Sequence, residues 1–211
     1  MSEESEIIAE STGAVVAALA EQSKTLEPIR AAAEYASNRL GLRYAPRLVD
    51  RAMAAAAKIK ESGLPALAYS EIGDPLLCAI LEASAIESDC DLQVVWENLL
   101  ANAMTDGSAS VARAYPRILG DLEPREVRIL DALVNKITGM PSPRFVLGDF
   151  PGDTTATNIG NLTRIELLEP IRDRVTTLGT ISDEAAETVG YRLTYLGWDF
   201  VNACQPPRLQ I

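Results

Sequence analysis

Apolar residues at helical spacing organise the centre of the chain. A helix is predicted from Pro75 to Ala85, because Asp74 is a good N-cap residue and proline suits the first helical position. An acidic hinge follows at residues 87–91. After it, a second amphipathic helix is predicted, because apolar residues recur at positions i, i+3, i+4, i+7 and i+11, namely Leu92, Val95, Trp96, Leu99 and Ala103. The pattern therefore predicts a helical hairpin over residues 74–104.

Two asparagines lie one turn apart in the second of these helices. Asn98 and Asn102 stand beside the apolar stripe, although asparagine is a weak helix former in a helix interior. This placement predicts that their side chains form hydrogen bonds across a helix contact.

Further helices are predicted on both sides of the hairpin. The N-terminal part favours helices over residues 7–21, 28–40 and from Pro46 to a stop at Gly63, and another helix opens at Pro124. Beyond residue 140, proline, glycine and strand-prone residues alternate with shorter helical patterns. We therefore predict a mainly α protein, with an all-helical domain over residues 1–120 and a winged helix-turn-helix-like domain with a small β-hairpin over residues 121–211.

A winged helix raises the question of DNA binding. Its recognition helix, predicted over residues 158–169, and its wing offer candidate nucleic-acid contacts at Asn158, Asn161, Arg164, Arg172 and Arg174. Neighbouring carboxylates at Glu166 and Glu169 oppose phosphate binding. The sequence favours a protein-interaction or structural role, and a DNA-binding transcriptional regulator is the alternative.

The net charge of −11 is unevenly distributed. Residues 1–60 carry eight acidic and eight basic residues, residues 61–110 carry nine acidic and none basic, and residues 111–211 carry thirteen acidic and eleven basic. Nearly the whole imbalance thus lies in the central segment. Such a charge disfavours general affinity for nucleic acids and for anionic membranes.

Two charged clusters are candidate interaction sites. Glu87, Asp89 and Asp91 alternate along the hinge, and acids in such a hinge more commonly remain solvated and cap the next helix. Together with Glu82 and Glu97 they are also a possible Mg²⁺ site, because that ion accepts oxygen ligands alone. Arg43, Arg47 and Arg51 belong to a basic patch that begins at Arg39 and could contact phosphate or pair with the acidic segment. We predict that these two clusters form an interaction surface.

Catalytic chemistry has little support in the sequence. The chain has no histidine, which is the commonest general base and metal ligand, and it lacks the glycine-rich motifs of nucleotide-binding loops. Its three cysteines show no paired spacing, and its acidic N-terminus is unlike a secretory signal. We therefore expect a cytoplasmic, non-enzymatic protein with no cofactor, no metal and no membrane span.

Three segments carry a resemblance to a known family. LEASAIESDCDLQVVWENLLANAM, AYPRILGDLEPREVRILDAL and YRLTYLGWDFVNAC resemble the Abi-alpha family, named for abortive infection, a bacterial defence against phage. The resemblance extends over residues 74–133 and 191–204, and more loosely over residues 26–60. It implies a cytosolic bacterial protein of phage resistance, and no catalytic residue is carried over from the family.

The resemblance implies a phage-defence protein, and the missing catalytic residues favour action through protein–protein interaction. The expected partner is phage-encoded or a second copy of the chain. A homo-oligomer is expected because alanine-rich helices leave apolar residues such as Val15, Leu19 and Ile59 without an assigned partner.

Overall fold

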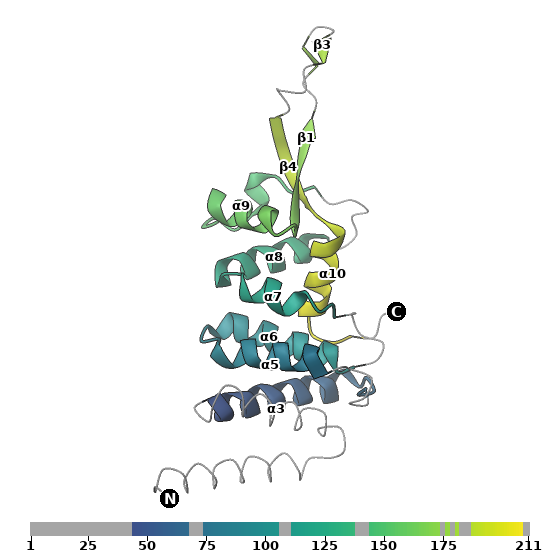
Figure 1. Ribbon diagram of the computed structural model, residues 1–211. Helices are drawn as coiled ribbons and strands as arrows, with labels where there is room; N and C mark the ends of the chain where they lie inside the picture. The colour runs from purple at the N-terminus through teal and green to yellow at the C-terminus, as the bar shows by residue number, and fades with distance from the viewer. Residues whose placement is uncertain are drawn as a thin grey trace, which may run out of the picture. The chain divides into compact units, whose positions relative to one another are not determined.

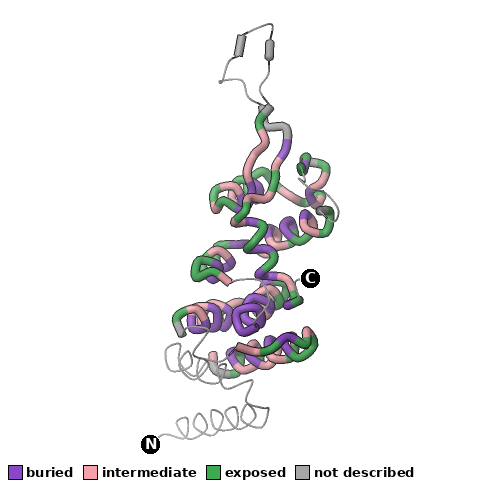
Figure 2. The backbone as a smooth tube through the Cα atoms, turned by 90° about the vertical axis from the view of Figure 1, so that its right-hand side faces the viewer, coloured by how far each residue is buried: buried purple, intermediate pink, exposed green. Residues whose placement is uncertain are grey.

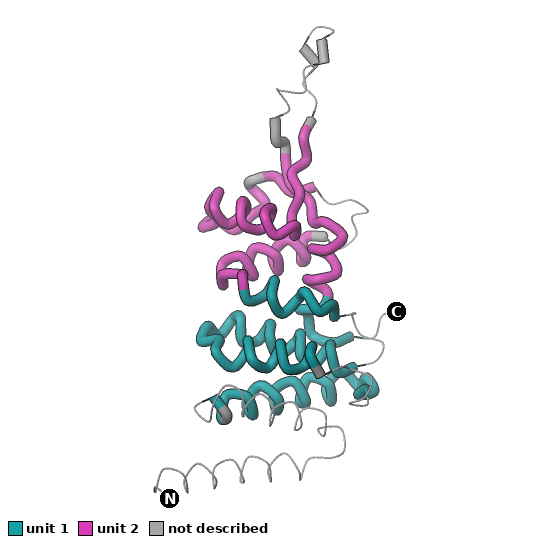
Figure 3. Tube along the Cα trace, viewed as in Figure 1, with its two compact units in different colours: residues 1–120, 203–211 teal, residues 121–202 magenta. Residues whose placement is uncertain are grey.

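The computed structural model describes residues 44–67, 74–105, 111–137, 144–173, 176–177, 180–181 and 187–208. The predicted helices over residues 7–21 and 28–40 lie outside this part, as do Val15, Leu19, Arg39, Arg43 and Arg174. Within it the fold is mainly helical, with seven helices and a small two-stranded antiparallel sheet near the C-terminus, so the predicted fold class is confirmed at this level (Figure 1). By its internal contacts the chain divides into unit 1, residues 1–120 with 203–211, and unit 2, residues 121–202 (Figure 3).

Unit 1 contains helices α3 (Ala45–Ser62), α5 (Asp74–Ile86), α6 (Cys90–Ala103) and α7 (Tyr115–Gly120). Helix α3 has a proline in its first turn and ends at Gly63, whose φ of 67° lies in the left-handed region that glycine adopts without a Cβ clash. The predicted third helix and the predicted hairpin are both confirmed.

Leucine, isoleucine and alanine side chains make most of the core of unit 1. The buried face of α3 repeats every three or four residues as Leu48, Ala52, Ala55 and Ile59, and α3 packs on both α5 and α6 (Figure 2). Alanine lets helices approach closely, and Trp96 of α6 supplies bulk at 1% exposure. Ile59 is only 3% exposed, so the expectation that it lacks a partner within the chain is wrong: this residue belongs to the core.

Unit 2 contains α8 (Pro124–Ile137), the short 3₁₀ helix η3 (Leu147–Asp149), α9 (Ala156–Arg164) and most of α10 (Tyr195–Cys204), whose last two residues count with unit 1. Strand β1 (Leu168–Asp173) pairs antiparallel with β4 (Glu187–Leu193), with a bulge after Ile171, and β2 (Thr176–Thr177) pairs with β3 (Thr180–Ile181). These pairings supply the small β-hairpin that the sequence predicted, whereas the winged-helix interpretation stays a prediction.

The predicted recognition helix is shorter than expected. We predicted a helix from Asn158 to Glu169, but α9 ends at Arg164 and Glu169 lies in β1. Glu166 follows with a φ of 63°, which ends a right-handed helix, and Pro170 cannot donate a helical hydrogen bond. Leu167 then belongs to the bend before β1, and Leu168 begins that strand instead of extending the helix.

One carboxylate fixes the turn that contains η3. Asp149 accepts a hydrogen bond from the backbone N–H of Val146 at 2.9 Å, and Lys136 lies 3.3 Å from its other oxygen. The Val146 N–H and the lysine charge hold the pKa of Asp149 below its ordinary value, since both favour the ionised form.

Candidate functional site

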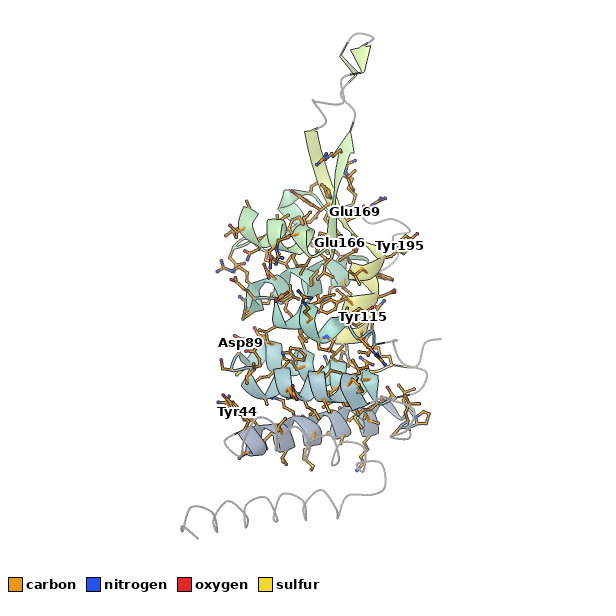
Figure 4. All side chains as sticks on the ribbon, in the orientation of Figure 1. Tyr44, Asp89, Tyr115, Glu166, Glu169 and Tyr195 are labelled. Atoms are coloured by element: carbon orange, nitrogen blue, oxygen red, sulfur yellow. The ribbon has the colours of Figure 1, made fainter. Side chains whose placement is uncertain are left out.

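The acidic hinge between α5 and α6 is organised by its own carboxylates. Asp89 is the N-cap of α6, and its Oδ1 accepts hydrogen bonds from the backbone N–H of Asp91 at 2.9 Å and of Leu92 at 3.1 Å. The first N–H groups of a helix have no partner within the helix, so this cap is worth about 1 kcal/mol. Figure 4 shows Asp89 at the end of the α5–α6 hairpin. One oxygen of Asp89 thus serves the helix start.

Glu87, two residues before Asp89, accepts backbone N–H groups of the hinge itself. Its Oε1 accepts hydrogen bonds from the N–H groups of Ser88 at 2.7 Å and Asp89 at 2.8 Å, and Gln93 donates to the Glu87 carbonyl at 3.2 Å. Asp91 lies exposed in the first turn of α6, where a negative charge is favourable near the positive end of the helix dipole. The hinge can therefore present negative charge, while one oxygen each of Glu87 and Asp89 is directed at the backbone.

A metal site was the alternative interpretation of these acids. Over the ranges that the structure describes, no group of three or more His, Cys, Asp or Glu side chains is arranged so that it could hold a metal ion.

The basic residues of α3 find partners other than the hinge acids. Arg51 donates to Glu97 of α6 at 2.8 Å, and both side chains are nearly buried, at 11% and 13% exposure. Lys58 approaches Glu97 at 3.5 Å and donates to the Asn98 Oδ1 at 2.7 Å. Arg47 is exposed and donates to the Ala85 carbonyl at 3.4 Å. Two arginines of the predicted interaction surface therefore contact neighbouring helices: Arg47 contacts α5 and Arg51 contacts α6.

Lys58 was not among the predicted site residues, and Glu97 was considered only as one of five possible metal ligands. A signal for them exists, because Arg51 and Lys58 are seven residues apart and so share one face of a helix. Only the packing of α3 on α6 shows that Glu97 lies opposite that face.

The two asparagines of α6 hold the C-terminal segment of unit 1. Asn98 Nδ2 donates to the Cys204 carbonyl at 2.9 Å, and Asn102 Nδ2 donates to the carbonyls of Ala203 at 2.8 Å and Gln205 at 2.7 Å. These acceptors include the last carbonyls of α10, which have no partner within that helix. The predicted hydrogen bonds across a helix contact are confirmed. Cys204 is buried there, and burial raises the pKa of its thiol.

In unit 2, Asn158 belongs to the N-terminus of α9. Its backbone N–H donates to the Thr155 hydroxyl at 3.3 Å, and its Oδ1 accepts from the Thr155 N–H at 3.2 Å and hydroxyl at 2.7 Å. This is a capping box, and Asn158 is 5% exposed. Buried in this way, Asn158 does not present its side chain to a nucleic acid in this conformation.

Asn161 is the centre of a polar chain between α9 and α8. Its Nδ2 lies 2.9 Å from both carboxylate oxygens of Glu126, which is 2% exposed and also accepts the Glu123 N–H at 3.0 Å. Its Oδ1 accepts from the Arg164 guanidinium at 2.7 and 3.1 Å. Of the predicted nucleic-acid contacts, Arg164 and Arg172 are exposed in the structure.

Two exposed aromatic residues were not predicted as site residues. Tyr195 is 95% exposed and Trp198 is 37% exposed in the first turn of α10. Their spacing of three residues places them on one helix face, but the spacing does not say whether that face meets the core or solvent. The structure supplies this information.

Comparisons with known proteins bear on the identity of the chain. Neither the curated proteins nor the solved structures contain a significant match. Among the described residues, the structure contains no helix that is long and apolar enough to cross a membrane. The family model described as abortive infection alpha matches residues 49–204, which covers well over half of the chain. The chain belongs to the abortive infection alpha family.

Proposed function

We propose that this protein is a cytoplasmic, non-enzymatic component of bacterial defence against phage and that it acts by binding other proteins. The defence role rests on its family, which is named for abortive infection. The mode of action rests on the chemistry of its side chains.

The non-enzymatic proposal rests on one observation: the candidate polar side chains form hydrogen bonds and ion pairs within the chain. Glu87 and Asp89 accept backbone N–H groups of their own hinge, and Glu97 is shared by Arg51 and Lys58. General acid–base chemistry needs a group that can reach a substrate proton and exchange it. Carboxylates held by backbone donors and by cations are better suited to fixing a surface than to exchanging protons.

Charge supports a role for the hinge in binding. The segment of residues 61–110 has nine acidic and no basic residues, and the second carboxylate oxygens of Glu87 and Asp89 lie outside the capping bonds described above. A partner with a basic surface is attracted to such a segment over about 10 Å at moderate salt. The partner in this proposal is phage-encoded or a second copy of the chain.

The proposal is tested first by activity assays on the purified protein. Incubation with RNA, DNA and nucleotides is expected to leave each of them intact. In parallel, cells that carry the protein are challenged with phage, and a reduced phage yield relative to cells without it is expected. Turnover of any of these substrates that is lost in an Asp89→Ala variant of intact fold contradicts the non-enzymatic proposal.

The same preparation tests the DNA-binding alternative. We expect no shift of duplex DNA at low salt, because Asn158 and Asn161 are engaged within unit 2. Binding that weakens steeply as salt rises, and that is reduced by Arg164→Ala or Arg172→Ala, would favour a regulator instead.

A further inference from the structure

Helix α10 carries an exposed face of unusual composition. Tyr195, Trp198 and Asp199 are all exposed and lie at positions that share one side of the helix. Glu166, also exposed, belongs to the turn that meets the start of α10. We call these four residues the aromatic–acidic face, and Figure 4 labels Tyr195 and Glu166 in this part of unit 2.

The backbone beneath this face is fixed. The Thr194 N–H donates to the Leu167 carbonyl at 3.1 Å, the Thr194 hydroxyl donates to the Glu166 carbonyl, and the Gly197 N–H donates to the Thr194 hydroxyl at 2.8 Å. A Cβ on Gly197 would lie 2.1 Å from the Leu167 carbonyl oxygen, so α10 and the turn touch at backbone distance. Glu166 and Tyr195 are therefore held near each other before any partner binds.

The exposure of the Tyr195 ring has no explanation in folding. A tyrosine at 95% exposure removes almost no apolar surface from water, and it therefore contributes little to stability. Tyrosine and tryptophan are the residues most often found as energetic anchors of protein interfaces. An exposed tyrosine with the partly exposed Trp198 beside it on the same helix face is typical of a binding surface.

The carboxylates identify the chemistry of the partner. Among the described residues, no ion pair is formed by Glu166 or Asp199, so their negative charges border the rings. Guanidinium groups stack on aromatic faces and pair with carboxylates, whereas phosphate groups of nucleic acids and anionic lipids are repelled by the same carboxylates. We propose that the aromatic–acidic face binds an arginine-bearing segment of a partner protein. This proposal rests on the function proposed above and adds the surface and the partner chemistry.

A peptide probe tests the face directly. Fluorescein-labelled peptide in which arginine alternates with glycine is titrated with the purified full chain, and binding is followed by fluorescence anisotropy. A double variant that combines Tyr195→Ala and Trp198→Ala lacks both rings and is expected to bind the peptide about tenfold more weakly. A second double variant, Glu166→Gln with Asp199→Asn, lacks both negative charges and is expected to weaken peptide binding by a similar factor.

Control variants remove an exposed apolar side chain or an exposed carboxylate elsewhere in unit 2. Val146→Ala deletes another exposed apolar side chain, and Asp121→Asn neutralises another exposed carboxylate, so both should bind like the wild type. Tyr195→Ala alone guards against misfolding, because its ring is almost fully exposed and its loss leaves no cavity. The same peptide with citrulline in place of arginine keeps the shape without the charge and should not bind.

The outcomes separate this surface from the proposed function. Absent binding, equal binding of the citrulline peptide, or equal binding by all variants overturns the aromatic–acidic face as an arginine site and leaves the defence role standing. Intrinsic turnover of nucleic acid or nucleotides overturns the non-enzymatic function, whatever the peptide result.

Discussion

Replacement of Asn102 by alanine tests how the C-terminal segment is held to α6. The variant loses two hydrogen bonds to the carbonyls of Ala203 and Gln205, at 2.8 and 2.7 Å, from a side chain that is 3% exposed. Each such bond contributes about 1 kcal/mol net, the small cavity adds about another 1 kcal/mol, and the higher helix propensity of alanine returns about 0.5 kcal/mol. We expect a loss of about 2.5 kcal/mol in the free energy of unfolding. For a chain of this length, that corresponds to a fall in Tm of about 5–10 °C.

The assay is urea unfolding followed by circular dichroism, with Asn135→Ala as the matched control. Asn135 is an exposed helical asparagine whose side chain donates to Asp131 one turn away, so its replacement should change the free energy of unfolding by less than about 0.5 kcal/mol. Asn102→Asp should be more destabilising than Asn102→Ala, because a carboxylate oxygen would face two carbonyl oxygens. An Asn102→Ala variant as stable as Asn135→Ala would refute this account of α6.

Three further changes test other parts of the structure. Gly197→Ala should cost at least about 3 kcal/mol in urea unfolding because its Cβ meets a backbone carbonyl, whereas Gly160→Ala, with nothing within 4 Å, should gain about 0.5–1 kcal/mol. Because the pKa of Asp149 is lower in the folded than in the unfolded protein, its ionised carboxylate stabilises the fold above the unfolded pKa, and this stabilisation is lost as the pH falls through the folded pKa. Asp149→Asn should therefore remove this contribution to the fall of Tm below about pH 4. A thiol reagent should modify the exposed Cys90 at once and the buried Cys204 only after unfolding, as mass spectrometry would show, and equal rates would contradict the burial.

Local signals in the sequence predicted α3, α5 and α6 of unit 1 well. Pro75 and Gly63 mark a helix start and a helix stop through backbone preferences that act over a few residues. The end of α9 was predicted too late, because the apolar periodicity continues through Leu167 and Leu168, although Leu167 lies in a bend and Leu168 begins β1. Periodicity alone does not distinguish a short buried strand from a helix segment.

Long-range partners were beyond the reach of these signals. The polar character of Asn98 and Asn102 indicated that they bond across a helix contact, but their acceptors lie 106 and 101 residues away. The pairing of Arg51 with Glu97 likewise depends on how α3 packs on α6. Spacing gives the face on which a residue lies, and tertiary packing decides what that face meets.

The exposure of Tyr195 illustrates the same limit at the candidate site. An aromatic residue in an apolar helix is usually expected to lie in the core. The Tyr195 ring is instead turned to solvent, because Gly197 and Phe200 are on the inner face of α10. A surface built from such residues becomes visible only once the inner face of the helix is known.

We propose that this member of the abortive infection alpha family works by contacts and not by chemistry at its acidic hinge, and the most direct test is the phage yield from cells that carry Asp89→Asn. Asparagine caps a helix about as well as aspartate, so the fold is kept while the carboxylate is lost. Asp89 supplies one of the nine negative charges of residues 61–110, so its loss changes the attraction of a basic partner only slightly. We therefore predict the same reduction in phage yield as for the wild type. Protection that disappears while the circular dichroism spectrum and Tm stay unchanged would contradict the proposal, because a carboxylate that exchanges a proton in a chemical step cannot be replaced by an amide.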